Sequence, residues 1–151
     1  MSKEGTLIDV RPMTILESAL VIDDVETDLF QAVQLLENQS VAGTIDTAPT
    51  GRAAMDRLAG RKDYPQLILL ELSAPHLGGL AFLDWLDQQP DEITRATRVI
   101  LLTGMLGQKP FLLRKAMEYP HVIGCIEKPL EANLLHELLE EGWPAPMASN
   151  Y

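Results

Sequence analysis

Five polar side chains stand at or just after the ends of short apolar runs, and their types suit the handling of a phosphoryl group. The residues are Asp23, Asp24, Glu71, Thr103 and Lys128. Carboxylates hold hard divalent cations such as Mg²⁺, whereas a hydroxyl and an ammonium contact phosphoryl oxygens. Singly, each residue has an ordinary explanation, because loop ends are solvated and aspartates often cap helices. The whole set, from four runs, instead indicates a binding site.

The apolar runs alternate with longer stretches of helical periodicity, which is typical of βαβ units. Strands are predicted at residues 19–22, 41–47, 67–72, 99–103 and 122–126. A helix follows each strand, and apolar residues at helical spacing mark its buried face. The five sets are Leu29, Val33 and Leu36; Ala54, Met55 and Leu58; Phe82, Leu83 and Leu86; Leu113, Ala116 and Met117; and Leu130, Leu134, Leu135, Leu138 and Leu139.

The strands differ in polarity, and this difference predicts their order. Residues 19–22, 67–72 and 99–103 are almost wholly apolar, as central parallel strands covered on both faces should be. The stretch 41–47 contains Asp46 and two threonines, so we place it at an edge. The predicted fold is α/β, a flavodoxin-like doubly wound (βα)5 sandwich with parallel sheet order 2-1-3-4-5. In such sheets, ligands bind outside the carboxyl ends of the strands, where the polar set lies.

Helix ends and domain limits follow from capping and turn residues. Asp24 is predicted to cap the first helix, Pro110 suits the first turn of the fourth, and Gly142 ends the fifth. The sequence therefore predicts an N-terminal extension, one domain and a C-terminal tail, at residues 1–17, 18–142 and 143–151.

Composition limits the function classes. A chain of 151 residues, 46% of them hydrophobic, is long enough for one folded domain. Its net charge of −10 argues against direct binding to nucleic acid or to anionic membranes, because both need clustered Lys and Arg. The single cysteine, the lack of an apolar secretory signal and the absence of any apolar run near the ~20 residues that cross a bilayer favour a cytoplasmic protein.

Four segments together resemble response-regulator receiver domains, the modules that accept phosphoryl groups in two-component and phosphorelay signalling. The segments are residues 20–24 (LVIDD), 67–75 (LILLELSAP), 100–104 (ILLTG) and 127–129 (EKP). They occur in the order and with the approximate separations typical of that family. The resemblance spans residues 18–141.

The resemblance implies a role for each polar residue of the set. In receiver domains, a phosphodonor transfers its phosphoryl group to an aspartate that ends the third strand, with Mg²⁺ bound beside it. By this resemblance, Glu71 is the phosphosite, Thr103 contacts a phosphoryl oxygen, and Lys128 forms an ion pair with the phosphosite. The metal ligands would be Asp23, Asp24, Glu71 and the backbone carbonyl of Ser73.

Glu71 departs from the family, in which the phosphosite is an aspartate. The extra methylene pushes the carboxylate toward the space of a phosphoryl group, so Glu71 is expected to mimic phospho-aspartate in part, with one charge instead of nearly two. It also displaces the nucleophile in a reaction that depends on positioning, so phosphorylation should be impaired and Mg²⁺ binding weak. Alternatively, the site has lost its chemistry and keeps Glu71 only as a partner for Lys128.

Cys125 is a second departure, at the position where the family usually has an aromatic switch residue. The inward swing of a Tyr or Phe therefore has no counterpart here. No His or Asp lies at a spacing that would activate Cys125 as a nucleophile, so we expect a packing role. Conformational coupling would then use other groups, such as the loop from Gly104 to Gly107.

The sequence thus predicts an interaction protein and not an enzyme. Our leading hypothesis is an atypical, phosphorylation-independent receiver domain that presents its fourth and fifth helices to a partner. By the resemblance, that partner is a histidine kinase, a phosphotransfer protein or an output protein, and a homodimer is compatible with the same surface. The second hypothesis is a phosphotransfer-competent receiver that still accepts a phosphoryl group with Mg²⁺, because Asp23, Asp24, Thr103 and Lys128 are retained.

Overall fold

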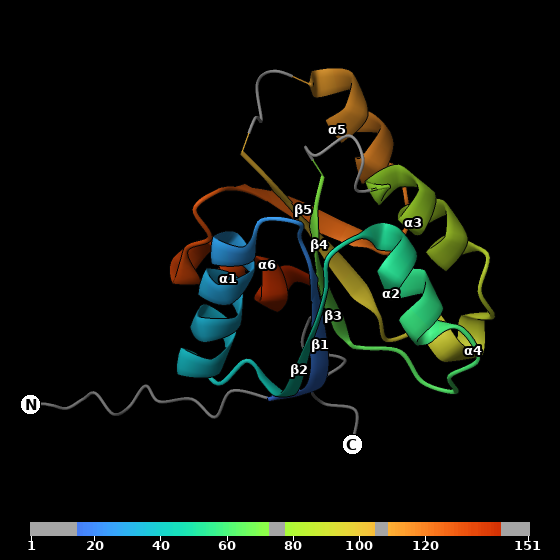
Figure 1. Ribbon diagram of the computed structural model, residues 1–151, viewed down its shortest axis with the longest axis horizontal. Helices are drawn as coiled ribbons and strands as arrows, with labels where there is room; N and C mark the ends of the chain where they lie inside the picture. Colours follow the sequence, from blue (N-terminus) through green and yellow to red (C-terminus); the bar gives the residue numbers. More distant parts are fainter. Residues whose placement is uncertain (1–14, 73–77, 105–108, 143–151) are drawn as a thin grey trace, which may run out of the picture.

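A parallel β-sheet forms the centre of the protein (Figure 1). The computed structural model describes residues 15–72, 78–104 and 109–142. Within these residues the sheet has five strands, β1 (Leu16–Ile22), β2 (Ala42–Ala48), β3 (Leu67–Glu71), β4 (Arg98–Thr103) and β5 (Val122–Glu127). Neighbouring strands are parallel and their order is β2-β1-β3-β4-β5, so the predicted doubly wound α/β fold with order 2-1-3-4-5 is confirmed.

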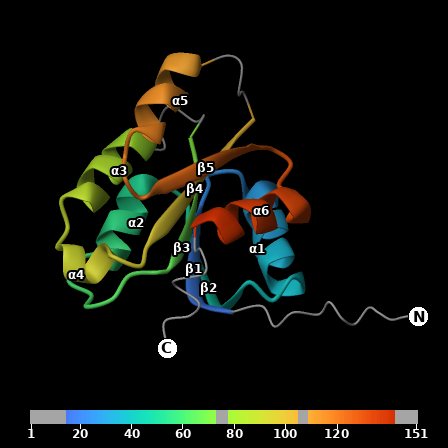
Figure 2. The ribbon, with the colours of Figure 1, turned by 180° about the vertical axis from the view of Figure 1, so that it is seen from behind.

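Helices cover both faces of the sheet (Figures 1 and 2). One face carries α1 (Glu26–Asn38) and α6 (Ala132–Gly142). The other carries α2 (Gly51–Leu58), α3 (Gly79–Asp87) and α5 (Pro110–Met117), and the short α4 (Asp91–Thr94) follows α3. Each layer encloses its own hydrophobic core. None of the described helices is long and apolar enough to span a membrane.

Alternation along β1 lets one strand serve both cores. Ala19 and Val21 belong to the core under α1 and α6, whereas Leu20 and Ile22 belong to the core under α2 and α3. This is the period of two that a strand imposes on its side chains. Every residue of β3 is buried as well. Two-sided burial explains why the central strands are nearly continuous apolar runs in the sequence.

The prediction is correct for the edge strand β2 and wrong for the start of β1. β2 lies at an edge of the sheet, as its polar residues predicted. β1, however, begins at Leu16 and not at residue 19, so residues 16 and 17 of the predicted N-terminal extension are part of the sheet. The amide of Leu16 donates to the carbonyl of Val41 at 2.9 Å. The polar residues that follow Leu16 conceal this part of the strand in the sequence.

The start of α1 also differs from the prediction. Its N-cap is Val25, whose side chain cannot accept a hydrogen bond, so the prediction that Asp24 caps this helix is wrong. The amide of Val25 donates instead to Asp23 Oδ1 at 3.0 Å. Pro110 begins α5, as predicted. The four-residue α4 was missed because so short a helix shows no period in a sequence.

Two residues of the predicted apolar helix faces lie outside the cores. Met117 on α5 is 43% exposed and Leu134 on α6 is 42% exposed. Each adjoins a fully buried residue, Ala116 and Leu135 respectively. A step of one residue turns a side chain by about 100° around the helix axis, so only one member of each adjacent pair points at the sheet.

Candidate functional site

The carboxyl ends of four neighbouring strands meet at one edge of the sheet. Asp23 follows β1, Glu71 ends β3, Thr103 ends β4 and Lys128 follows β5. The sheet's hydrogen bonding continues past these ends, because the amide of Lys128 donates to the carbonyl of Thr103 at 2.8 Å. The backbone therefore fixes the point from which the Lys128 side chain reaches across the edge.

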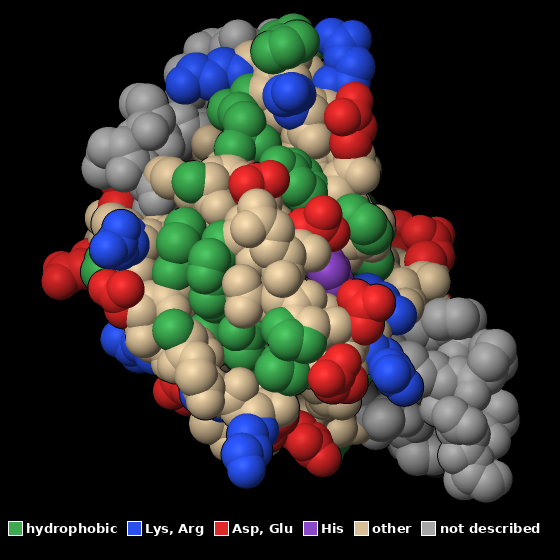
Figure 3. Space-filling view, turned by 90° about the vertical axis from the view of Figure 1, so that its right-hand side faces the viewer, with side chains coloured by type: hydrophobic (Ala, Val, Ile, Leu, Met, Phe, Trp, Pro, Cys, Tyr) green, Lys and Arg blue, Asp and Glu red, His purple; other side chains and the backbone are tan. Residues whose placement is uncertain are grey.

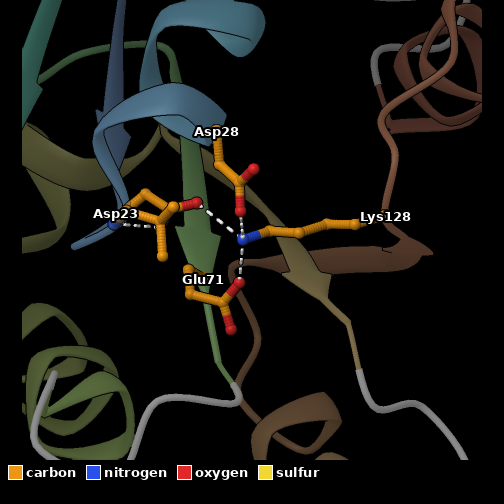
Figure 4. Close-up of polar contacts among 5 residues, drawn as sticks. Asp23, Asp28, Glu71 and Lys128 are labelled. Atoms are coloured by element: carbon orange, nitrogen blue, oxygen red, sulfur yellow. Dashed lines mark hydrogen bonds and ion pairs between the residues drawn. The ribbon is translucent and has the colours of Figure 1, made fainter.

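The Lys128 side chain joins three carboxylates (Figure 4). Its Nζ lies 2.8 Å from Asp23 Oδ2 and 2.8 Å from Asp28 Oδ2, and it also contacts Glu71 Oε1. The carboxylates come from the end of β1, from α1 and from the end of β3. We refer to Asp23, Asp28, Glu71 and Lys128 as the lysine cluster. The structure thus brings together three of the five residues predicted from sequence and adds Asp28.

Burial and charge shape the lysine cluster together. The side chains of Asp23 and Glu71 are 1% and 4% exposed, that of Lys128 is 17% exposed and that of Asp28 is 34% exposed. Burial raises the pKa of Asp23, although hydrogen bonds from Lys128 and from the Val25 amide act to lower it. Burial also lowers the pKa of Lys128, but its hydrogen bonds to the three carboxylates outweigh burial and leave this pKa raised. Lys128 is therefore an ammonium at neutral pH.

Asp28 was not predicted as a site residue. It lies in the first turn of α1, where a negative charge is common because the helix dipole favours it. Because this explanation is sufficient, the sequence does not indicate that Asp28 also pairs with Lys128. Local spacing does not reveal this role, because Asp24 lies before the first residue of α1 and the i,i+4 relation holds only within a helix.

The other predicted site residues are Asp24, Thr103 and Ser73. Asp24 follows Asp23 and is partly buried, whereas Thr103 is 5% exposed at the end of β4. Ser73, the predicted source of a carbonyl ligand, lies outside the described residues, as does most of the loop from Gly104 to Gly107.

The lysine cluster does not fit a divalent metal as it is arranged. In the part of the chain that the structure describes, no group of three or more His, Cys, Asp or Glu side chains is placed to hold a metal ion. Each carboxylate of the cluster directs an oxygen at Lys128, and the other oxygen of Asp23 accepts the Val25 amide. Mg²⁺ requires about six oxygens at 2.0–2.1 Å in octahedral geometry. In this arrangement Lys128 engages one oxygen of every carboxylate in the cluster.

A pocket of about 290 Å³ opens beside the lysine cluster, on the side of α1. Its polar lining includes Asp23, Asp28 and Lys128, so solvent reaches the cluster from this side. The full lining is Asp23, Asp28, Gln31, Ala32, Leu102, Lys128, Pro129 and Leu130.

Cys125 lies on β5, opposite Leu101 of β4, and packs against the core under α2 and α3. Burial raises the pKa of its thiol to about 11, and the negative charges of Glu71 and Glu127 act in the same direction. The thiol is therefore protonated at neutral pH and is a poor nucleophile. This environment suits the packing role predicted for Cys125.

Comparisons with known proteins identify one family. The model of the response regulator receiver domain matches residues 19–140. A response regulator receiver protein from Dyadobacter fermentans is 28% identical, with a TM-score of 0.73 over 85% of this chain and 98% of that one. A two-component response regulator from Cytophaga hutchinsonii is 25% identical, with a TM-score of 0.70 over 85% and 98% of the two chains.

A third similar structure, a two-component response regulator from Legionella pneumophila, is 28% identical with a TM-score of 0.67, over 82% of this chain and 95% of that one. No curated protein matches the sequence. The family match covers most of the chain, and the sheet order and the strand-end cluster agree with it. The chain therefore belongs to the response regulator receiver domain family of two-component signalling.

Proposed function

We propose that this protein is an atypical receiver domain that signals through protein–protein interaction, with Glu71 acting as a partial mimic of phospho-aspartate. The observation that carries the proposal is the ion pair between Glu71 Oε1 and Lys128. In receiver domains, this lysine is expected to pair with the phosphosite. Glu71 supplies a permanent negative charge at that place without a phosphoryl group.

The mimicry is incomplete for two reasons. A glutamate carries one negative charge and two acceptor oxygens, whereas a phosphoryl group carries nearly two charges and three oxygens. Lys128 is also shared, because Asp23 and Asp28 contact the same ammonium. We therefore propose that Glu71 biases the domain toward its signalling state without reaching full activation.

Phosphoryl acceptance at Glu71 should be poor. In-line phosphoryl transfer depends almost entirely on the placement of the nucleophile, and the extra methylene displaces the Glu71 carboxylate relative to an aspartate. Receiver domains generally bind Mg²⁺ at the phosphorylation site. Here we expect weak Mg²⁺ binding, because the carboxylate oxygens of the lysine cluster are engaged by Lys128.

The partner surface that we propose comprises α5, β5 and α6. Phe111 and Met117 on α5 are 71% and 43% exposed, and Arg114 and Lys115 lie on the same helix. Figure 3 shows hydrophobic side chains along the side of the molecule that carries α3 and α5, with Lys and Arg gathered near its upper end. A cytoplasmic histidine kinase, phosphotransfer protein or output protein is the kind of partner we propose, in contacts that need no enzymatic activity of this chain.

A second candidate function is a receiver that still accepts a phosphoryl group. The retention of Asp23, Asp24, Thr103 and Lys128 favours it, and Asp23 and Thr103 are buried. Its acceptor would be Glu71 or a neighbouring acid, with hydrolysis assisted by Mg²⁺.

A labelling experiment separates the candidates. We would incubate the wild type, Glu71→Asp and Glu71→Gln with a small acyl-phosphate donor and Mg²⁺, and measure protein mass before the labile product hydrolyses. The proposal predicts that only Glu71→Asp gains a phosphoryl group, because the shorter side chain restores the position of the nucleophile. Glu71→Gln is the control for labelling elsewhere on the chain. Equal labelling of the wild type would favour the second candidate, and no labelling of any variant would indicate that the site has lost its chemistry.

A further inference from the structure

The ammonium of Lys128 is fully coordinated inside the protein. A lysine has three N–H donors, and Nζ has three carboxylate partners, one each from Asp23, Asp28 and Glu71. The distances from Nζ to Asp23 Oδ2 and to Asp28 Oδ2 are both 2.8 Å, within the range of strong charge-assisted hydrogen bonds. Each N–H donor of Lys128 therefore has a carboxylate partner within the chain.

Asp28 is the partner that distinguishes this arrangement from a simple pairing between strand ends. It projects from α1, whose position is fixed by the buried Ala32 and Leu36. The loop before the helix is tied as well, because the Val25 amide donates to Asp23 Oδ1 at 3.0 Å and the Leu29 amide donates to the Val25 carbonyl at 2.9 Å. The Asp28 carboxylate is thus presented to Lys128 from a rigid support.

Access does not explain the poor fit to a metal. The pocket beside the lysine cluster is lined by Asp23, Asp28 and Lys128, so a hydrated ion can approach. The obstacle is that the oxygens already hold the ammonium. A divalent ion would compete with Lys128 for the oxygens of Asp23 and Glu71 that face the ammonium.

We propose that Asp28 is a positioning residue that holds Lys128 against Asp23 and Glu71, so that Lys128, and not a divalent metal, is the resident cation beside these carboxylates. The inference goes beyond the proposed function and holds whether or not Glu71 mimics phospho-aspartate. It makes the charge balance of the site less dependent on Mg²⁺ concentration, because this cation is covalently part of the chain.

The test relies on a change in cation affinity that is opposite to the change expected from charge alone. Asp28→Asn removes a negative charge, which by electrostatics alone should weaken the binding of any cation. If Asp28 clamps Lys128, the same change frees the ammonium to move aside, and binding should tighten. Glu26→Gln is the matched control, since Glu26 lies in the same first turn of α1, is exposed and carries the same charge.

We would titrate the three folded proteins with Mg²⁺, and with Mn²⁺ as a paramagnetic probe, and follow the backbone NMR signals around Glu71. The proposal predicts binding at least threefold tighter in Asp28→Asn than in the wild type, and unchanged or weaker binding in Glu26→Gln. Binding in Asp28→Asn that is equal to or weaker than in the wild type would overturn it.

A second measurement uses the Lys128 ammonium directly. Its ¹⁵N-attached protons should exchange slowly with water in the wild type, remain unchanged on addition of millimolar Mg²⁺, and exchange at least tenfold faster in Asp28→Asn. Displacement of the ammonium signal by millimolar Mg²⁺ in the wild type would refute the resident-cation assignment. So would exchange in the wild type that is as fast as that of an exposed lysine.

Discussion

Replacement of Lys128 by methionine should destabilise the protein in a pH-dependent way. Methionine keeps much of the length of the side chain but removes the cation that three carboxylates share. Removing one partner from a buried ion pair typically costs about 3–5 kcal/mol. Asp23 and Glu71, at 1% and 4% exposure, carry this cost, whereas Asp28 adds little because water screens a residue that is 34% exposed. We expect a loss of about 3–5 kcal/mol near neutral pH.

The pH dependence follows from proton binding by the buried Asp23. Burial already raises the pKa of Asp23 in the presence of Lys128, and loss of the ammonium should raise it further. Above about pH 4, the ordinary range of an unfolded carboxylate, the folded variant then binds more protons than its unfolded chain. Its stability therefore increases as the pH falls from neutral toward that value, and the difference from the wild type narrows.

Urea denaturation at pH 7.5 and pH 5 would measure both effects. Trp85 is a suitable fluorescence reporter, because it stacks on Tyr64 and contacts Phe82 at ring-centroid distances of 6.0 Å. Lys62→Met, which removes an exposed lysine, is the control for loss of a positive charge. A Lys128→Met variant as stable as the wild type at pH 7.5, or one with the same deficit at both pH values, would refute the reasoning.

Three further predictions concern the fold around the site. Gly124→Ala should lower the free energy of unfolding by about 1–3 kcal/mol in urea titrations, because an added Cβ would lie 2.6 Å from Leu138 Cδ2. An unchanged midpoint would show that Leu138 on α6 moves aside without cost. Thr50→Ala should cost about 0.5–2 kcal/mol, since Thr50 Oγ1 accepts the Ala53 amide at 3.0 Å and caps α2, whereas Thr50→Ser should retain most of that stability. Alkylation of Cys125 in the native protein should be at least about tenfold slower at pH 8 than in the urea-unfolded chain, since its thiol has a pKa of about 11; comparable rates would contradict its burial.

The sheet could be predicted because its central strands carry their own signal. β3 and β4 are buried on both faces, so their sequences are short apolar runs between helical stretches. A strand that is exposed to solvent lacks such a continuous apolar run and is harder to predict. The start of β1 carries the exposed Glu17 beside the buried Leu16, and this polar residue hides the strand until its pairing with β2 is known.

The site residues that lie at the ends of strands could be predicted from the sequence. Asp23, Glu71 and Lys128 each stand where an apolar run stops, and parallel strands bring such ends to one edge. Asp28 escaped prediction because it sits on a helix, where an acidic first turn has a sufficient local explanation. Its contact with Lys128 depends on how α1 packs on the sheet. That is tertiary information, which local spacing does not contain.

The lysine cluster also affects the order in which the domain can assemble. Lys128 and Asp28 are 100 residues apart in the sequence, and Lys128 follows the last strand of the sheet. A chain emerging from the ribosome presents β1 and β3 long before β5. Burial of Asp23 and Glu71 without Lys128 would be unfavourable, so a nascent chain ending before β5 gains little from closing the sheet early. We therefore expect the sheet to close only after β5 has emerged.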